Sequence, residues 1–432
     1  MGWQELFAIM KSDLEGRGVT VPPPLLGLAY ETAQAVLPRW ADIDARARCN
    51  FARVLRAFGE ARLSELSFAP TTGYGYNDLG RAQLEKSFAS VFGGQSALVR
   101  SQITSGTHAI TLGLFGNLQP GDQLLSVGPP YDSLQTVIGH HMDKPARGAL
   151  VELGVAYRES AWGENGLPDE DDLARCCTDQ TALVFIQRSR GYQTRRSLPM
   201  AVIKRLVAVV RKHAPQAAVM VDNCYGEFVA EVEPGHVGAD LVAGSLIKNP
   251  GGGLAPTGGY LVGREDLIAG AAARLTAPGL GAALGATIGT EKRLMFQGLF
   301  LAPALVGEAL KGAVFAAEFF QRLGFKVDPL PEQDRADIIQ VIELGQEEFV
   351  TDFCLGVQRA GAVEWWVRPV AGDLPGYVDP VLMAAPTFIQ GASLELSADA
   401  PLRHPYRVYL QGGLQASQTI AACLSAAAQM GL

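Results

Sequence analysis

The chain has 432 residues, of which 48% are hydrophobic and 19% are charged, so it can bury a large core and carries too little charge for a disordered protein. Its formal net charge is -8 and it has no basic cluster, which argues against a nucleic-acid-binding protein. Six cysteines are too few for a disulfide framework. No Cys-x-x-Cys pair occurs, so we expect no metal site.

The sequence contains no clear targeting or membrane segment. Its start, Met1-Gly-Trp-Gln-Glu, lacks the basic region and the apolar run of a signal peptide. The apolar segment 299–306 is too short to span a membrane and contains Pro303. We therefore expect a cytoplasmic protein that does not associate with membranes.

Residues 1–62 are predicted to form a helical arm, since apolar side chains recur at helical spacing between residues 37 and 66. The arm could pack on a partner subunit, or it could be an ordinary helical extension of the same core. A large α/β domain is predicted for residues 63–302, and a smaller α+β domain for residues 303–432.

Two loops near the start of the large domain could bind an anion. In the first, Tyr74 and Tyr76 lie among glycines, and either hydroxyl could donate to a phosphate or either ring could simply pack. In the second, Ser105-Gly106-Thr107 precedes a helix, where free backbone N–H groups and hydroxyls favour an anion. Serine and threonine are also the commonest helix caps, so this signal alone is weak.

Short apolar runs separated by helical segments predict a mostly parallel sheet. Strands are expected at residues 123–127, 182–186, 218–222, 240–245 and 257–262, and an amphipathic helix at residues 199–213. In such sheets the ligand lies at the carboxyl ends of the strands. The residues predicted at that edge are Gly106, Tyr131, Arg188, Asp222 and Lys248.

The pair Asp222 and Lys248 indicates the chemistry. Asp222 ends one buried strand, and Ser245-x-x-Lys248 follows the next strand and enters a glycine-rich loop. Separately, each has an ordinary explanation, as a turn residue or a solvated lysine. Together they suit pyridoxal phosphate, whose ring nitrogen takes a carboxylate partner and whose aldehyde takes a lysine amine. Tyr131 could stack on the cofactor ring and act as an acid, or it could be a packed aromatic residue.

In the small domain, helices are expected at residues 305–323 and 347–360, with a strand at residues 338–342 between them. Arg403 and Arg407 flank the start of a short strand near the end of the domain. Either guanidinium could bind a substrate carboxylate, and either could instead form a surface ion pair.

With these residues in view, the chain resembles the fold-type-I pyridoxal-phosphate enzymes, and most of all the methionine γ-lyase-like group of aluminium-resistance proteins. That group belongs to the cystathionine γ-synthase and γ-lyase superfamily. The matching stretches are Thr72-Gly-Tyr-Gly-Tyr-Asn-Asp-Leu-Gly-Arg81, Ser105-Gly-Thr-His-Ala-Ile110, Val221-Asp-Asn-Cys-Tyr-Gly-Glu-Phe228, Gly244-Ser-Leu-Ile-Lys-Asn-Pro-Gly-Gly-Gly253 and Gly391-Ala-Ser-Leu-Glu-Leu-Ser-Ala-Asp399.

The resemblance implies a seven-stranded, mostly parallel sheet between helices and a homotetramer built as a dimer of dimers. It implies that Lys248 forms the Schiff base and that Asp222 contacts the pyridine nitrogen. Tyr131 would stack on the ring and protonate the leaving group. The phosphate would be held by Ser105, Gly106, Thr107 and Ser245, and by Tyr74 or Tyr76 from a neighbouring subunit. Arg407 occupies the place of the carboxylate-binding arginine, with Arg403 as its competitor.

The sequence also departs from the superfamily pattern. The superfamily's Tyr-Ser-Arg loop is Tyr74-Gly-Tyr76 here, so its arginine is missing. Arg188 and Arg190 replace the usual Asn-Pro turn and could line a different substrate pocket.

The predicted function is a pyridoxal-phosphate lyase that eliminates a sulfur group, or another group such as a halide, from Cβ or Cγ of an amino acid. Two alternatives are an aminotransferase and a non-catalytic protein of metal tolerance or regulation.

Overall fold

The computed structural model describes residues 2–140, 147–373 and 377–432 and divides into two compact units. The large unit is Asn50–Leu301, and the small unit joins Met1–Cys49 to Ala302–Leu432. The sequence had placed these divisions at residues 62/63 and 302/303. The N-terminal segment therefore shares a unit with the C-terminal one, although the two are far apart in the sequence.

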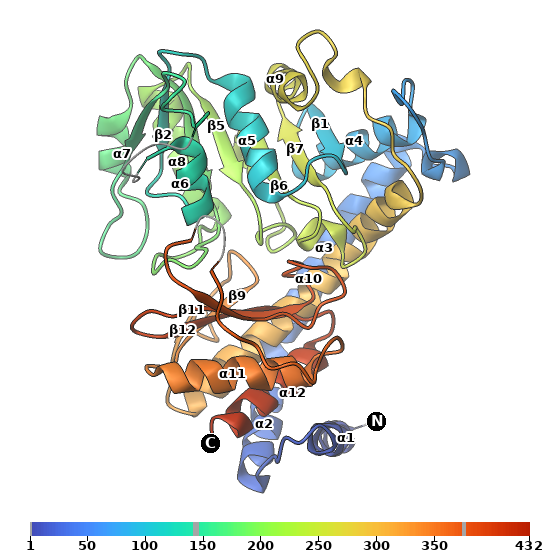
Figure 1. Ribbon diagram of the computed structural model, residues 1–432, viewed down its shortest axis with the longest axis vertical. Helices are drawn as coiled ribbons and strands as arrows, with labels where there is room; N and C mark the ends of the chain where they lie inside the picture. Colours follow the sequence, from blue (N-terminus) through green and yellow to red (C-terminus); the bar gives the residue numbers. More distant parts are fainter. Residues whose placement is uncertain (1, 141–146, 374–376) are drawn as a thin grey trace. The chain divides into compact units, whose positions relative to one another are not determined.

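The large unit is built on a seven-stranded sheet with the strand order β1-β7-β6-β5-β4-β2-β3 (Figure 1). Strands β2 to β6 pair in parallel, while β7 runs antiparallel to both β6 and β1. The mostly parallel α/β fold that the sequence predicted is thereby confirmed. The strands are β1 (Ser96–Arg100), β2 (Gln123–Ser126), β3 (Ala156–Glu159), β4 (Thr181–Gln187), β5 (Ala218–Asp222), β6 (Leu241–Ser245) and β7 (Gly259–Gly263).

β1 and β3 are not among the strands that the sequence predicts. Both are edge strands and both are short. β3 reads Ala-Tyr-Arg-Glu and is not fully buried at any position, so it carries no apolar run. Tertiary pairing with β2, rather than local hydrophobicity, makes this segment a strand.

Helices cover both faces of this sheet, and the alternation of side chains along β4 assigns them. Leu183 and Phe185 pack with α5 (Gly106–Asn117), α6 (Asp132–Ile138) and α9 (Glu265–Leu275). Val184 and Ile186 pack with α7 (Glu170–Cys176) and α8 (Met200–His213). A sheet that is buried on both faces explains the continuous apolar runs of its central strands. Helix α4 (Leu79–Phe92) packs on β1 and β7.

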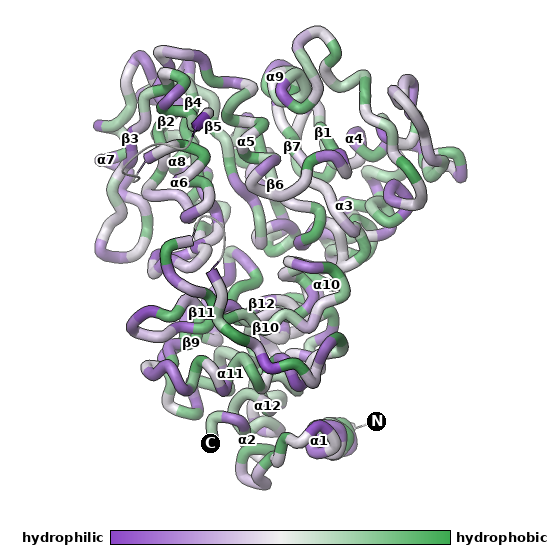
Figure 2. Tube along the Cα trace, in the orientation of Figure 1, coloured by the Kyte–Doolittle hydropathy of each residue, from purple (hydrophilic) through white to green (hydrophobic). Residues whose placement is uncertain are grey.

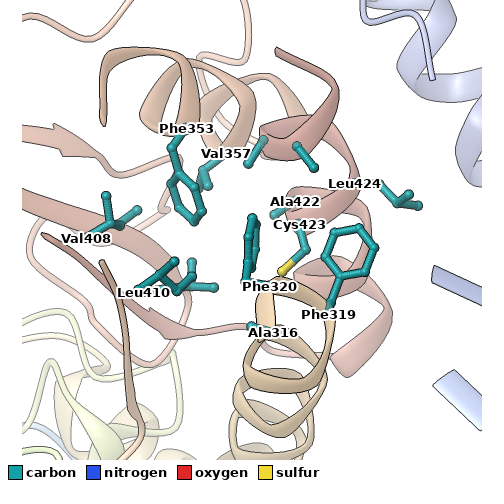
Figure 3. Packing of buried hydrophobic residues seen from close by; sticks show 14 of the residues in the cluster. Ala316, Phe319, Phe320, Phe353, Val357, Val408, Leu410, Ala422, Cys423 and Leu424 are labelled. Atoms are coloured by element: carbon teal, nitrogen blue, oxygen red, sulfur yellow. The ribbon is translucent and has the colours of Figure 1, made fainter. Parts of the chain in front are cut away.

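The small unit contains a five-stranded antiparallel sheet with the order β10-β11-β12-β9-β8. Helices α11 (Glu347–Ala360) and α12 (Ala416–Gln429) lie side by side against it (Figure 1). Phe320 and Phe353 meet in its core at 5.3 Å between ring centroids (Figure 3). The strands are β8 (Lys326–Asp328), β9 (Ile339–Glu343), β10 (Val381–Ala384), β11 (Leu396–Pro401) and β12 (Arg407–Gly412).

The N-terminal helices α1 (Trp3–Gly16) and α2 (Pro23–Ala35) belong to the same core. Phe7, Met10 and Leu14 form the buried stripe of α1, and its alternating hydrophobic and hydrophilic faces are visible in Figure 2. These side chains join the cluster that contains Phe320 and Phe353. Of the two explanations for the arm, the structure therefore supports an extension of the core of its own chain.

Two long helices, α3 (Leu37–Ala61) and α10 (Glu291–Arg322), contain residues of both units. The apolar segment 299–306 lies inside α10, which continues through Pro303 and begins well before residue 305, where the sequence predicted a helix to start. Leu299, Ala302 and Val306 are fully buried, so tertiary packing outweighs the lost helical hydrogen bond. Of the helices in the described ranges, α10 alone has the length and apolarity of a membrane span, but 67% of its most apolar window is buried, as in a core helix.

Candidate functional site

The carboxyl ends of five strands of the large sheet carry most of the predicted site residues. Gly106 follows β1, Tyr131 follows β2, and Arg188 follows β4. Asp222 is the last residue of β5, and Lys248 follows β6. Because β1 runs in the same direction as the parallel strands, all these residues lie at one edge of the sheet.

The start of α5 meets the ends of β5 and β6 at close quarters. A Cβ atom added to Gly106 would lie 3.1 Å from Sγ of Cys224 and 3.4 Å from Cβ of Ser245. The helix N-terminus, with its partial positive charge, is therefore brought directly to the residues around Asp222 and Ser245. This is the convergence that the sequence predicted for an anion site.

The hydroxyl groups at this helix start have defined neighbours. Ser105 caps α5, and its Oγ accepts a hydrogen bond from the His108 N–H at 3.0 Å. Oγ1 of Thr107 lies 2.9 Å from the hydroxyl of Tyr131. The backbone N–H of Tyr131 donates to Oε1 of Gln187 at 2.9 Å, which holds the tyrosine at the end of β4.

Asp222 is a buried carboxylate at the end of β5. Its Oδ1 accepts a hydrogen bond from the backbone N–H of Cys224 at 3.0 Å. Burial raises the pKa of Asp222, against the opposing effects of Cys224, Lys248 and Arg195. The predicted role of Asp222 is to pair with the protonated ring nitrogen of the cofactor. That positive charge would in turn favour the ionised form of the carboxyl group.

Lys248 projects from the turn that follows β6. Its Nζ lies 3.4 Å from the centre of the Tyr225 ring. Burial by itself would lower the pKa of the Lys248 ammonium, but Tyr225, Cys224 and Asp222 outweigh it, so the pKa lies above its ordinary value. Tyr225 has no predicted role, although it lies inside the matched stretch 221–228.

Close backbone packing holds the loop of Lys248 in place. A Cβ atom on Gly251 would lie 1.6 Å from the carbonyl oxygen of Leu246, so only glycine fits there. Nδ2 of Asn249 donates to the carbonyl of Glu227 at 3.0 Å. The glycine-rich sequence after Lys248 therefore serves packing as well as chain reversal.

The arginines after β4 are buried. Arg188 is fully buried and donates through Nη1 to Oδ1 of Asn223 at 2.7 Å and to the carbonyl of Gly226 at 2.6 Å. Arg190 is also buried, and its N–H donates to Oγ of Ser197. Their predicted part in a substrate pocket stays a prediction. Arg195 has no predicted role, and its positive charge partly opposes the rise in the pKa of Asp222 that burial causes.

Tyr74 and Tyr76 lie together on an exposed loop, with 5.3 Å between their ring centroids. Arg81 holds the loop by donating from Nη1 to the carbonyl of Gly75 at 2.8 Å and to that of Gly285 at 2.6 Å. A role of these tyrosines at a partner's phosphate remains a prediction.

Arg403 and Arg407 belong to the small unit and each has an acidic partner there. Nη2 of Arg407 lies 2.9 Å from Oε2 of Glu343, and Nη1 of Arg403 lies 2.9 Å from Oδ2 of Asp379. If either arginine binds a substrate carboxylate, its guanidinium must bind both the substrate and its present acidic partner, or it must leave that partner. Which arginine binds a carboxylate therefore stays a prediction.

Glu227 carries a buried carboxyl group and lies in the same stretch as Asp222 and Tyr225. Its Oε1 accepts the Tyr260 hydroxyl at 2.9 Å, whereas Oε2 has no hydrogen-bond partner within the described parts of the chain. Burial, with smaller effects of Glu233 and Asp222, raises the pKa of Glu227 to about 8. A protonated, neutral carboxyl group explains how Glu227 can be buried although no ion pair joins it to the described residues.

Replacing Glu227 with glutamine should stabilise the protein increasingly as the pH rises. At low pH the folded and unfolded chains both hold the Glu227 proton. Between the ordinary glutamate pKa and about 8, only the folded chain keeps the proton. The free energy of unfolding of the wild type therefore falls as the pH rises, whereas a neutral glutamine at this position causes no such loss. Urea unfolding at pH 5 and pH 9 should show a gain over the wild type of up to about 4 kcal/mol at the higher pH. An equal difference at both pH values would contradict the protonated state.

Comparisons with known proteins show the fold and the family of this chain. The architecture is that of the fold-type-I pyridoxal-phosphate proteins, and it is shared with the pyridoxal-phosphate-dependent protein YhfS of Escherichia coli at a TM-score of 0.59 and 17% identity, over 91% of this chain and 97% of that one. The chain belongs to the methionine gamma-lyase family, whose model matches residues 26–431.

More similar relatives extend over most of the chain. YnbB, an uncharacterised protein of Bacillus subtilis strain 168, is 48% identical over 87% of this chain and 89% of its own length. A solved structure from Listeria monocytogenes, described as a candidate cystathionine beta-lyase involved in aluminum resistance, has a TM-score of 0.90 and 44% identity, over 93% of this chain and 98% of that one. A carbon-sulfur lyase involved in aluminum resistance from Clostridium novyi NT has a TM-score of 0.91 and 42% identity, over 95% of this chain and 96% of that one.

Proposed function

We propose that this protein is a pyridoxal-phosphate-dependent carbon–sulfur lyase that eliminates a group from Cβ or Cγ of an amino acid. The observation that carries the proposal is the convergence at one sheet edge of the α5 start, the Asp222 carboxylate and the Lys248 loop. Membership of the methionine gamma-lyase family supports the lyase chemistry. The description of the Listeria relative supports a thioether substrate such as cystathionine.

The donor set at this edge fits pyridoxal phosphate. Asp222 offers a carboxylate to the ring nitrogen, Lys248 offers an amine to the aldehyde, and Gly106 and Thr107 at the helix start, with Ser245, offer N–H and hydroxyl groups to the phosphate. When bound, the cofactor would supply an electron sink that makes the substrate's Cα proton acidic.

The chain's own residues would supply the proton transfers. The neutral amine of Lys248 would take the proton from Cα, and for a leaving group at Cγ it would also take one from Cβ. The Tyr131 hydroxyl would give a proton to the departing sulfur. Thr107 would orient that hydroxyl, since the two oxygens already lie 2.9 Å apart.

The test is to incubate the purified protein with pyridoxal phosphate and L-cystathionine, and separately with L-methionine and a β-halogenated alanine. A lyase should release ammonia and a keto acid in equal amounts, together with a thiol or a halide. With cystathionine, pyruvate and homocysteine mean β-elimination, whereas 2-oxobutyrate and cysteine mean γ-elimination. A keto acid that forms only when an amino acceptor is added, without ammonia, would favour the aminotransferase and contradict the proposal.

We also propose that the protein is a homo-oligomer in which Tyr74 or Tyr76 completes a neighbouring subunit's site. The exposure of these two rings, 67% and 58%, supports a contact outside their own subunit. The test mixes inactive Lys248→Ala subunits with subunits that carry Tyr74→Ala and Tyr76→Ala. Mixed oligomers should regain activity if the tyrosines act across the interface. If the mixture is as inactive as its parents, the shared site is refuted.

A further inference from the structure

Tyr225 has an unusual backbone conformation at the site. It is a bulky residue in the left-handed region, with φ of 69°. For such a residue this conformation costs on the order of 1 kcal/mol or more, and it persists only where the surroundings impose it. The strained residue is the one whose ring lies 3.4 Å from Nζ of Lys248.

The turn that carries Tyr225 is held by hydrogen bonds within the turn and from the buried Arg188. The N–H of Gly226 donates to the carbonyl of Asn223 at 2.9 Å, which closes the turn. Arg188 donates to both Asn223 and Gly226 and so holds the turn at two points. A Cβ atom on Gly226 would lie 2.6 Å from the guanidinium carbon of Arg188, so the contact requires glycine. The position of the Tyr225 ring is therefore set by a buried charged residue.

The segment that carries Lys248 is anchored as well. The carbonyl of Lys248 accepts a hydrogen bond from the N–H of Gly251 at 3.2 Å, and the next residue, Asn249, is bonded to the carbonyl of Glu227. The Lys248 amine and the Tyr225 ring therefore face each other from two segments that are each held by hydrogen bonds. An ammonium over an aromatic ring is attracted by the negative face of the ring, and more strongly when water is excluded.

We propose that Tyr225 is a positioning residue that holds the protonated amine of Lys248 whenever this amine is not bonded to the cofactor. The proposal rests on the function proposed above. During turnover, the amine that has just taken a proton would find a stabilised place on the ring, and it would remain near the reacting carbon. In the cofactor-free protein, the same contact keeps the amine charged and slows its reaction with an aldehyde.

The titratable groups that raise the pKa of this amine come from the last residue of β5 and the segment that follows it. They are Tyr225, the thiol of Cys224 and the carboxylate of Asp222, and all three favour the ammonium. Tyr225 differs from the other two because it offers both a ring face and a hydroxyl. Its two contributions can be separated, since phenylalanine keeps the ring and leucine removes both.

The experiment measures the reactivity of Lys248 in the cofactor-free protein. The wild type, Tyr225→Phe and Tyr225→Leu are treated with formaldehyde and a mild reductant across a range of pH, and methylation of the peptide that contains Lys248 is followed by mass spectrometry. At neutral pH, Tyr225→Leu should react about tenfold faster than the wild type, and Tyr225→Phe should lie in between. The reason is that a fall of about one unit in the pKa of the Lys248 amine raises its reactive neutral fraction about tenfold. The pH of half-maximal rate should fall by a similar amount.

Tyr406→Leu is a matched control, because Tyr406 is also a tyrosine in the left-handed region, with φ of 57°, and belongs to the small unit. It should leave the Lys248 profile unchanged. If Tyr225→Leu does not fold, the comparison of Tyr225→Phe with the wild type still tests the hydroxyl. Identical pH profiles for the wild type and the folded Tyr225 variants would overturn the proposal. The readout needs no cofactor, so its outcome is independent of whether the protein proves to be a lyase.

Discussion

Replacing Lys248 with alanine is expected to abolish the covalent attachment of pyridoxal phosphate and to lower any elimination activity by at least about a thousandfold. The variant loses the amine that would bond to the cofactor and that would also carry the Cα proton, and general acid–base catalysis alone is worth about 10² to 10⁴ in rate. The measurement is the visible absorbance of the loaded protein, followed by borohydride reduction and the mass of the Lys248 peptide.

Lys204→Ala is the control for this prediction. Lys204 lies on the exposed side of α8 and should contribute nothing to cofactor attachment. A reduced cofactor on another lysine, or an unchanged visible band in Lys248→Ala, would show that Lys248 has been assigned wrongly. A wild-type protein that stays colourless with pyridoxal phosphate would instead refute the cofactor itself.

Replacing Arg188 with methionine is expected to cost about 3 to 5 kcal/mol of folding free energy, the usual effect of removing one partner from a buried ion pair. Arg188 is buried beside Glu233, with 3.7 Å between Nη1 and Oε2, and it also donates to Asn223 and Gly226. Methionine fills similar space but leaves these acceptors without this donor. Because the chain has two compact units, the readout is the urea midpoint of the transition that affects the large unit.

Arg205→Met is the matched control, because Arg205 forms an exposed ion pair with Glu170 on the same unit. Exposed pairs are worth about 0 to 1 kcal/mol, so its midpoint should barely move. If both variants unfold at the wild-type midpoint, Arg188 does not support the turn that carries Tyr225. A loss confined to Arg188→Met would support that assignment.

Local patterns in the sequence predicted much of the candidate site. Asp222 and Lys248 could be assigned because each follows a buried strand, and the carboxyl ends of parallel strands share one edge of the sheet. Gly106 and Thr107 could be assigned because helix starts attract anions. These are short-range signals, and the fold preserves them: a Cβ atom added to Gly106 would lie 3.1 Å from Sγ of Cys224, just after β5, and 3.4 Å from Cβ of Ser245 at the end of β6.

Other features needed the tertiary structure, because they depend on residues distant in sequence. α10 continues through Pro303 because the side chains around the proline are buried, and β3 is a strand because β2 pairs with it. Arg188 is buried and donates hydrogen bonds to the 223–226 turn, contacts that no local pattern in the sequence indicates.

By itself, then, the sequence determined the mostly parallel sheet, the edge that carries the site and the acid–lysine pair, since each of these depends on local hydrophobicity and on where a strand ends. Only the tertiary structure decided that the N-terminal helices join the C-terminal core, that the Glu227 carboxyl is buried and that the Tyr225 ring faces Lys248. Burial and the distance between side chains on different loops decide these three features, and no local pattern encodes either quantity.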